Sequence, residues 1–234
     1  MIYNDNCFVN KDEKITKFIP EKEPIEIKVN EILYKKLFYQ KKDINYKELK
    51  LSNIGIYSMT KYKMAKQICK IIIKLNNTKN LIITDALGNV GGMTILLAKY
   101  FKYVNTCEII NLHSNIIKNN LHVYNYDKKV NVINDDYFNI MFKIKQDIIF
   151  LDPPWGGLDY KNQDGLILHI NNVNISCIIN ALLKYAKYII VLIPYNFSGS
   201  DLLKILSKFE IIILDKKKIN SHRLLIVNGK YTIN

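Results

Sequence analysis

The stretch Leu81-Ile82-Ile83-Thr84-Asp85-Ala86-Leu87-Gly88-Asn89-Val90-Gly91-Gly92-Met93-Thr94 decides the fold. Its apolar beginning, residues 81–84, predicts a strand, and a helix is predicted to begin at Gly92. Glycines in such a turn let the backbone approach a ligand closely, and the amino end of a helix favours negative groups. Tight turns between a strand and a helix also need glycine for structural reasons, so the loop alone is weak evidence for a binding site.

Short apolar strands and helices alternate along the chain on both sides of this loop. The sequence predicts further strands at 103–108, 130–133, 148–151 and 188–193, and helices at 61–75, 92–100, 113–124, 175–186 and 202–209. Segments 211–214 and 223–227 are predicted to pair antiparallel at the sheet edge. The alternation predicts an α/β, Rossmann-like fold with a mostly parallel seven-stranded sheet and helices on both faces. Ligands of such sheets bind at the carboxyl ends of the strands.

The first part of the chain differs from the rest in composition. Residues 1–52 are rich in lysine and contain a helix-like run at 31–38. We expect a basic, partly helical arm over 1–52, ordered by contact with a single domain over 53–234. Thr60 is predicted to cap the helix that follows it.

The charge of the chain indicates a polyanionic partner. Lys and Arg total 34 against 21 Asp and Glu, which gives a net charge of +13. Nucleic acid is the simplest partner of so basic a protein. The abundance of Lys, Asn and Ile offers a compositional explanation for part of the charge. Arg223 is the only arginine, so phosphates would be attracted mainly by the point charges of lysines.

The sequence does not favour a membrane, secreted, disulfide-rich or metal-binding protein. No stretch reaches the roughly 18 uninterrupted apolar residues of a membrane span. The first residues lack the apolar core of a signal peptide, so we expect a soluble intracellular protein. The four cysteines are scattered singly, and the histidines have no ligand spacing, so we expect neither a disulfide framework nor a metal site.

A carboxylate ends the strand predicted after the glycine loop. Glu108 lies about 20 residues beyond that loop, where an acidic side chain reaches the two ribose hydroxyls in nucleotide-binding sheets. The spacing indicates a cofactor that contains adenosine. Asp85 would repel the pyrophosphate of NAD, so S-adenosylmethionine, which has a zwitterionic tail, fits the loop better.

Asp135 and Asp136 follow the strand predicted at 130–133, at the height expected for the adenine ring. Either carboxylate is a candidate acceptor for the exocyclic amine of that ring. A solvated loop, or a cap for a short helix at 137–142, explains each residue equally well.

A second candidate site follows the strand predicted at 148–151, in the sequence Asp152-Pro153-Pro154-Trp155-Gly156-Gly157. Consecutive prolines donate no hydrogen bonds to a sheet, so the strand ends there and the next carbonyls stay available. A carboxylate, an indole and two glycines together can hold a flat ring that bears nitrogen. Trp155 is the only tryptophan, and these neighbours make a place deep in a core the less favoured interpretation. The segment indicates an enzyme that methylates an exocyclic amine.

These segments resemble the trimethylguanosine synthase family, class I methyltransferases that methylate N2 of a 7-methylguanosine RNA cap. The likeness covers most of 57–227 in chain order. The most specific match is Pro153-Pro154-Trp155-Gly156-Gly157-Leu158-Asp159-Tyr160, which is similar to the family's Pro-Pro-Trp-Gly-Gly-Pro-x-Tyr. The other matching segments are Tyr57-Ser58-Met59-Thr60, Asp85-Ala86, Gly91-Gly92-Met93-Thr94-Ile95, and Asn119-Asn120 with Tyr124.

The resemblance implies a class I methyltransferase fold, S-adenosylmethionine as cofactor, capped RNA as partner, no metal and a monomeric chain. The residues implied for cofactor binding are Thr60, Asp85, Gly88, Gly91, Glu108, Asp136 and Asp152. Those implied for catalysis and substrate binding are Asp152, Pro153, Trp155, Gly156 and Tyr160. In this scheme Trp155 stacks on the methylated guanine, a delocalised cation for which an indole is the best aromatic partner. Asp152 and the Pro153 carbonyl accept from the N2 amine and orient it for direct displacement at the sulfonium methyl.

The chain departs from the family pattern in the cofactor loop. The family commonly has Cys-Gly-Val-Gly-Gly where this chain has Gly88-Asn89-Val90-Gly91-Gly92, so the loop is open to a different path. The family's second acid and proline after the strand are replaced by Ile109-Ile110-Asn111. Two alternatives stay open. One is a catalytically weak scaffold that binds RNA, and the other is an N6-adenine methyltransferase whose similar motif holds a flipped neutral base.

Overall fold

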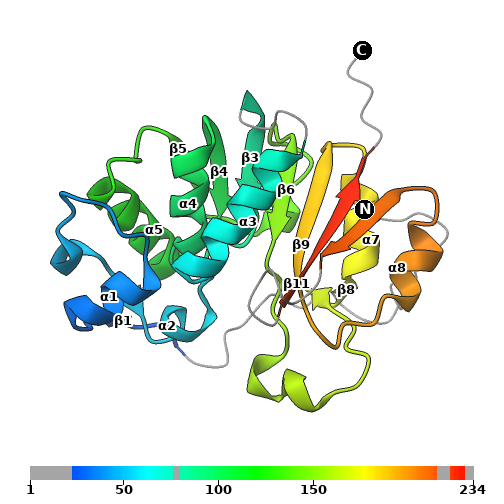
Figure 1. The fold of residues 1–234 in the computed structure, drawn as a ribbon, viewed down its shortest axis with the longest axis horizontal. Coiled ribbons are helices and arrows are strands. Elements are labelled where there is room, and N and C mark those ends of the chain that lie inside the picture. Colours follow the sequence, from blue (N-terminus) through cyan, green and yellow to red (C-terminus); the bar gives the residue numbers. More distant parts are fainter. Residues whose placement is uncertain (1–22, 76–79, 215–221, 230–234) are drawn as a thin grey trace. The chain divides into compact units, whose positions relative to one another are not determined.

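The computed structural model describes residues 23–75, 80–214 and 222–229 (Figure 1). Its strands are β1 (Glu26–Ile27), β2 (Leu51–Ser52), β3 (Ile82–Asp85), β4 (Tyr103–Cys107), β5 (Val130–Ile133), β6 (Ile148–Leu151), β7 (His169–Ile170), β8 (Val173–Asn174), β9 (Tyr188–Pro194), β10 (Glu210–Leu214) and β11 (His222–Asn228). Its helices are α1 (Glu31–Leu37), α2 (Gly55–Ser58), α3 (Tyr62–Lys74), α4 (Gly92–Tyr100), α5 (Asn111–Val123), α6 (Tyr137–Ile140), α7 (Ile175–Leu182) and α8 (Ser200–Ile205), with 3-10 turns η1 (Tyr46–Glu48) and η3 (Gly157–Asn162).

The strands confirm the predicted α/β class. One seven-stranded sheet has the order β10-β11-β9-β6-β3-β4-β5, and β1-β2 and β7-β8 form two small sheets. The predicted helix at 92–100 and the predicted strands at 130–133 and 148–151 have the observed bounds of α4, β5 and β6. Within the ranges that the structure describes, no helix combines the length and the apolar character needed to cross a membrane.

The described residues fall into two compact units, 23–149 and 150–229. The predicted boundary between an arm over 1–52 and a domain over 53–234 stays a prediction, and residues 1–22 lie outside the described part.

The unit 23–149 is built on three parallel strands. β4 pairs parallel with β3 on one side and with β5 on the other. α4 packs against β3 and β4, and Gly92 through Ala98 are all buried, as suits its nearly continuous apolar sequence. α3 covers α4 with the apolar face predicted from its spacing. The prediction that Thr60 caps α3 is wrong, because Lys61 is the residue at the N-cap and makes no side-chain cap hydrogen bond.

The segment 23–52 is ordered against the same unit. Its predicted helix is confirmed as α1, whose N-cap residue Asn30 accepts a hydrogen bond from the Leu33 amide. β1 and β2 pair antiparallel. Asn120 on α5 accepts from the Lys50 amide at 2.8 Å and donates to the Lys50 carbonyl at 3.0 Å, which fixes the end of this segment to α5.

The unit 150–229 carries the antiparallel edge. β11 pairs antiparallel with both β9 and β10, as predicted for the edge pair. Every residue of β9 is buried, which its unbroken apolar run accounts for. α7 ends at Leu182 rather than at the predicted 186, because the amides of Tyr185 and Ala186 both donate to the Leu182 carbonyl in a closing turn.

Candidate active site

Asp85, the last residue of β3, is almost wholly buried, with 1% of its surface exposed. The hydroxyl of Thr94, in the first turn of α4, donates to Asp85 Oδ2 at 2.6 Å. Burial raises the pKa of Asp85 to about 6, and the hydrogen bond from Thr94 opposes that rise. The end of the strand and the start of the helix are thus fixed around one carboxylate.

The glycines of the loop lie where a side chain would either clash or strain the backbone. A Cβ on Gly88 would lie 2.4 Å from Thr106 Oγ1, and the Gly88 amide donates to the Cys107 carbonyl at 2.8 Å. Gly91 has φ +89, a conformation that glycine adopts without strain. A Cβ on Gly92 would lie 2.5 Å from the Thr60 carbonyl oxygen, so the Thr60 backbone packs directly on the start of α4.

Asn89 explains how the loop tolerates its departure from the family pattern. Its φ is 50°, in the left-handed region where asparagine is the commonest residue after glycine. Asn89 therefore occupies a conformation that suits the glycine of the family pattern. Its side-chain Nδ2 donates to Ser58 Oγ at 2.8 Å, which ties the loop to α2.

Glu108 follows β4 and is hydrogen-bonded to the backbone of the glycine loop. Its Oε2 accepts from the Asn89 amide and its Oε1 from the Ile110 amide, both at 2.8 Å. Burial raises the pKa of Glu108 to about 7, against the lowering effect of these two hydrogen bonds. Only 8% of the residue is exposed, so the side chain holds the loop shape as well as being the candidate ribose acceptor.

His113 lies beneath this carboxylate as a core residue. It is 2% exposed, and its Nε2 is 2.8 Å from Ser52 Oγ, which also accepts from the Gly55 amide. Burial lowers the pKa of His113 to about 4, so the ring is neutral near pH 7 although Nδ1 lies 3.9 Å from Glu108 Oε1. His113 is therefore a core residue.

Asn120 is a supporting residue that the sequence did not single out for a role. Besides holding Lys50, its Nδ2 donates to the Val90 carbonyl at 3.2 Å. The glycine loop is therefore braced by α5 through a fully buried amide. Its pairing with Asn119 in the matching segment was the available signal, but the partners of an amide are set by the fold.

Asp136 is the N-cap residue of α6, as one interpretation of the sequence predicted. Its Oδ1 accepts from the Phe138 amide at 3.0 Å. Asp135 Oδ1 accepts from the Asp136 amide and from Asn139 Nδ2. Asn134 Nδ2 donates to the Glu108 carbonyl at 2.8 Å, so the loop that carries Asp136 is attached to the residue that holds the glycine turn.

Substitution of Gly88 by alanine tests whether the loop depends on this close approach. The new Cβ would displace Thr106 Oγ1 and Ile117 Cδ1, so we expect a loss of about 1–3 kcal/mol in the free energy of unfolding. Gly199→Ala is the matched control, because its Cβ meets nothing within 4 Å and its φ is −94°. Denaturant unfolding measures both, and equal stabilities of the two variants would contradict the packing of the loop.

The second group of candidate residues follows β6. Trp155 is half-buried, with the Tyr160 ring edge-on to the indole at 5.1 Å and 72°. The His222 ring of β11 lies 4.9 Å from the indole and is tilted by 44°. Trp155 Nε1 is buried and has no hydrogen-bond partner in the described part of the chain. His222 was missed as a neighbour of Trp155, because no sequence spacing links β11 to this loop.

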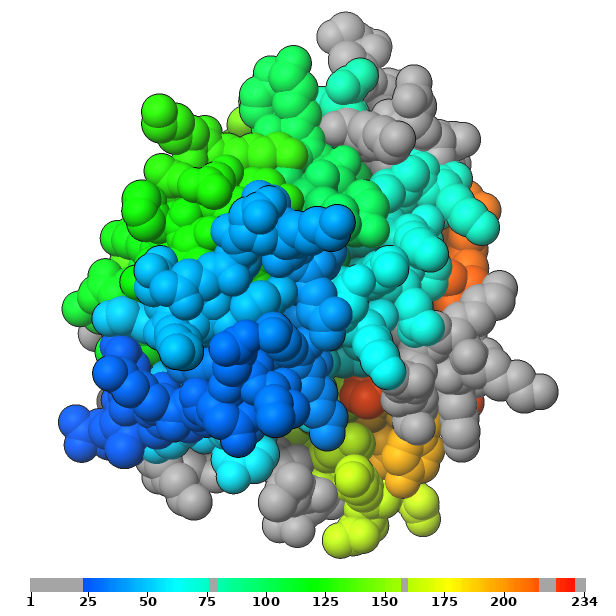
Figure 2. Space-filling view, turned by 60° about the vertical axis from the view of Figure 1, so that its left-hand side comes forward, coloured from blue at the N-terminus to red at the C-terminus, as the bar shows by residue number. Residues whose placement is uncertain are grey.

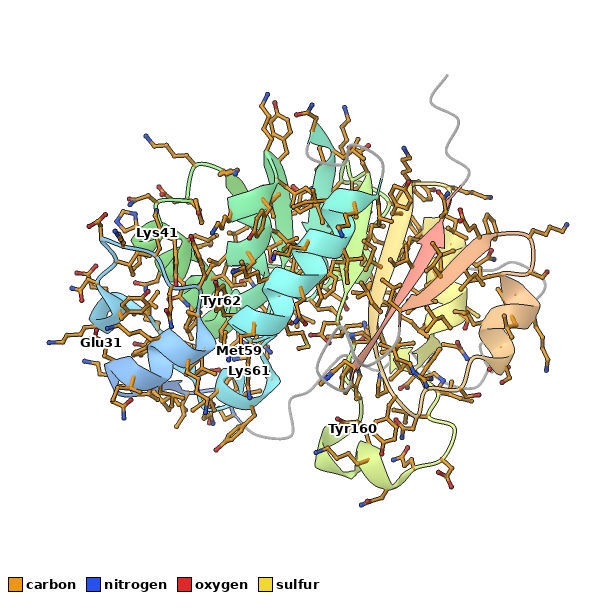
Figure 3. All side chains as sticks on the ribbon, in the orientation of Figure 1. Glu31, Lys41, Met59, Lys61, Tyr62 and Tyr160 are labelled. Atoms are coloured by element: carbon orange, nitrogen blue, oxygen red, sulfur yellow. The ribbon has the colours of Figure 1, made fainter. Side chains whose placement is uncertain are left out.

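The turn after Trp155 is held by the segment that follows β9. Asn196 Nδ2 donates to the carbonyls of Tyr160 and Gln163 at 2.7 and 2.6 Å. The Tyr195 hydroxyl donates to the Lys161 carbonyl at 3.0 Å. Tyr160, labelled on η3 in Figure 3, is thus held by its backbone while its ring contacts the indole.

The remaining predicted residues of this group differ in exposure. Pro153 is buried, Asp152 is half-buried and Gly156 is exposed. Gly156 has φ +87, so the turn requires glycine although a Cβ there would meet nothing within 4 Å.

The structure therefore gathers the predicted residues into two groups. Within 23–149, the group around the glycine loop comprises Thr60, Asp85, Gly88, Gly91, Glu108 and, through Asn134, Asp136. Within 150–229, the group after β6 comprises Asp152, Pro153, Trp155, Gly156 and Tyr160. The binding roles of both groups stay predictions.

A mostly parallel sheet with a glycine turn after β3 and a carboxylate after β4 is the arrangement of the class I methyltransferase fold. Solved structures share this fold. Magnesium protoporphyrin IX methyltransferase from Synechocystis, solved with S-adenosylmethionine, superposes with a TM-score of 0.51 at 17% identity over 72% of this chain and 79% of that one. An O-methyltransferase from Thermotoga maritima gives 0.53 at 14% identity over 76% and 69%.

The profile of the RNA cap guanine-N2 methyltransferases matches residues 79–229, and the chain belongs to this family. An uncharacterized protein of Acanthamoeba polyphaga mimivirus is 33% identical over 158 residues, 65% of this chain and 60% of the relative. Trimethylguanosine synthase of Schizosaccharomyces pombe is 25% identical over 155 residues, 62% of this chain and 63% of the enzyme. The chain thus spans about three fifths of the length of these relatives.

The loop residues fit the cofactor of this class. Gly88 leaves no room for a side chain toward β4, and Gly91 supplies the left-handed turn. Oδ1 of Asn89 is buried without a hydrogen-bond partner among the described residues, so the loop contains an acceptor that no described group satisfies. S-adenosylmethionine carries an ammonium group and ribose hydroxyls as donors, which an amide oxygen and a carboxylate can accept.

Proposed function

We propose that this protein methylates the exocyclic N2 amine of the 7-methylguanosine cap of RNA. The setting of Trp155 carries the proposal. The indole is half-buried, and the two aromatic rings that the described residues place beside it, Tyr160 and His222, are edge-on and tilted rather than parallel to it. Neither neighbour occupies the stacked arrangement that a bound guanine would adopt.

The charge of the methylated base favours this pairing. Methylation at N7 makes guanine a delocalised cation, and its attraction to an indole face contributes about 1–2 kcal/mol once desolvated. Tyr160, whose ring is 5.1 Å from the indole and inclined to it by 72°, holds the indole in place for that stacking.

Asp152 and Pro153 have the acceptor role in this proposal. The Asp152 carboxylate and the Pro153 carbonyl accept the two N–H groups of the N2 amine and so direct its lone pair. β6 ends at Leu151, so the Pro153 carbonyl lies beyond the end of this strand. S-adenosylmethionine supplies an electrophilic methyl group on a good leaving group, so the contribution of the chain is mainly orientation.

Glu108 and the glycine loop have the cofactor role. Glu108 is the acceptor for the ribose hydroxyls, and the turn at Gly88 and Gly91 lets the backbone lie close to the cofactor. Asp85, Thr60, Asp136 and Asp152 complete the proposed set.

A methyl-transfer assay with labelled S-adenosylmethionine tests the substrate. We expect transfer to a 7-methylguanosine cap dinucleotide. We also expect the cap that lacks the N7 methyl to be a poorer substrate by about 5- to 30-fold in kcat/KM, because the positive charge on the base is lost. An oligonucleotide containing adenine is the second comparison.

Label on adenine and not on the cap would contradict the proposal in favour of an N6-adenine methyltransferase. Binding of S-adenosylmethionine and RNA without any transfer would instead indicate the scaffold. Calorimetry with S-adenosylmethionine shows whether the cofactor binds. It therefore separates a scaffold that still binds the cofactor from a protein that has lost its cofactor site.

A further inference from the structure

A row of tyrosines crosses the unit 23–149 away from the glycine loop. The Tyr39 ring lies between those of Tyr62 and Tyr124, at centroid distances of 5.6 and 6.1 Å. Tyr126 extends the row, 6.2 Å from Tyr124 and stacked at 16°. These four residues come from the N-terminal segment, from α3 and from the end of α5 together with the turn after it. The fold thus assembles one aromatic row from three separate parts of the chain.

Four lysines lie over this row. Lys99 Nζ is 3.7 Å from the Tyr39 centroid, and Lys66 Nζ is 5.6 Å from that of Tyr62. Lys41 and Lys129 place their Nζ atoms 5.3 and 5.8 Å from the Tyr126 centroid. We call the four tyrosines and these four lysines the Lys–Tyr surface.

The four lysines of this surface, like most lysines that the structure describes, have no acidic partner among the described residues. Lys35 pairs with Glu31, and Lys50 pairs with Glu26. Among the described residues, no carboxylate lies within 4.0 Å of the ammonium groups of Lys41, Lys66, Lys99 or Lys129. The positive charge of the surface is therefore not neutralised locally.

Part of the row has a structural role. The Tyr124 hydroxyl donates to the Tyr39 carbonyl, and Lys41 Nζ donates to the Tyr124 carbonyl at 3.1 Å. These contacts attach the N-terminal segment to α5, and Tyr124 is fully buried. Packing of this kind does not require four cations without acidic partners. Tyr62 and Tyr126 are only half-buried, so the row also reaches solvent.

Figure 2 looks onto the side of the molecule where the residues near 40 lie between α3 and the region of α5. Figure 3 labels Lys41 on that segment and Tyr62 at the start of α3. The hydrogen bonds and ring contacts between these parts agree with the views.

We infer that the Lys–Tyr surface binds the single-stranded RNA chain that continues beyond the cap. Proteins that hold single strands without sequence preference combine cations that follow the phosphates with aromatic rings on which bases stack. Both parts are present here, interleaved on one unit. The inference rests on RNA being the substrate, as proposed above, but it concerns residues outside both groups of the candidate active site.

Charge removal at two of the lysines tests the inference. In the double variant Lys66→Gln/Lys99→Gln, glutamine keeps a polar group near the tyrosine hydroxyls and removes both charges. We expect affinity for an uncapped single-stranded RNA of 15 to 20 nucleotides, measured by fluorescence anisotropy, to fall on the order of tenfold. The slope of log affinity against log salt should become shallower by about 1.4 if both lysines meet phosphates.

The matched control is Lys35→Gln/Lys50→Gln, which removes the same charge from lysines that already face glutamates. We expect this control to change RNA affinity less than twofold. Equal weakening by the two double variants would overturn the inference, because net charge would then be the cause. Unchanged RNA binding by Lys66→Gln/Lys99→Gln would overturn it as well.

Turnover separates the surface from the proposed activity. For a capped RNA of the same length we expect Lys66→Gln/Lys99→Gln to raise KM, with KM and kcat for the cap dinucleotide unchanged. A wild-type protein that binds RNA through these lysines but methylates no cap would refute the proposed function and leave the surface standing. A protein that methylates the cap, but whose RNA binding and KM are unchanged in Lys66→Gln/Lys99→Gln, would refute the surface and leave the proposed function standing.

Discussion

Trp155→Ala is expected to reduce kcat/KM for the cap dinucleotide by at least about 30-fold, since loss of a desolvated cation–π contact alone removes about 2 kcal/mol. Loss of base orientation adds to that figure, because the N2 amine is no longer held in line with the methyl group. The affinity for S-adenosylmethionine should change little, because Trp155 is not one of the proposed cofactor residues.

Trp155→Phe is the matched variant, because it keeps a flat ring with a weaker attraction for cations. It should retain more activity than Trp155→Ala on the 7-methylated cap. Kinetics with the cap dinucleotide and calorimetry with the cofactor measure the two effects separately. A parallel loss of cofactor binding and turnover in Trp155→Ala would mean that the indole is structural.

Glu108→Gln is expected to weaken S-adenosylmethionine by about 1–3 kcal/mol, or about 5- to 150-fold in Kd. The carboxylate accepts from the amides of both Asn89 and Ile110, and a glutamine turns an N–H donor toward one of them. One buried amide then lacks an acceptor, so the free energy of unfolding should also fall by about 1–3 kcal/mol.

Asp147→Asn is the control for this substitution. Asp147 Oδ2 accepts from the Ile82 amide at 2.8 Å, at the start of β3, away from the glycine loop. The control should leave cofactor affinity unchanged. Cofactor affinity that is as high in Glu108→Gln as in the wild type would contradict the role of Glu108 as ribose acceptor.

The raised pKa of Glu108 gives this residue a pH signature. Between its ordinary value of 4.5 and about 7, the folded protein holds the proton more firmly than the unfolded chain does. Its contribution to the free energy of unfolding therefore falls as pH rises through that window. Because the ionised form accepts hydrogen bonds best, cofactor affinity should rise from pH 6 to pH 8. Calorimetry over this range should show the rise in the wild type and a smaller rise in Glu108→Gln, in which Asp85, with a pKa raised to about 6, still titrates.

Much of the fold follows from local patterns that sequence reveals. The apolar run of β6, the glycine that begins α4 and the proline that ends β9 are local signals, and each marked its element boundary. The ends of helices were predicted less accurately. Thr60 is not the N-cap residue of α3, and α7 ends at Leu182, before the predicted residue 186. Those ends depend on which turn the tertiary packing allows.

By itself, the sequence determined the α/β class, the glycine loop with Glu108 after the next strand, and the family, because these depend on short spacings and residue types. Only the tertiary structure decided that Asn89 takes the left-handed conformation, that Asn120 braces the loop, and that His222 meets Trp155. It also decided that four lysines without acidic partners lie over one row of tyrosines. The physical reason is that such contacts join residues far apart in the chain, and side-chain partners at that range are selected by packing and not by spacing.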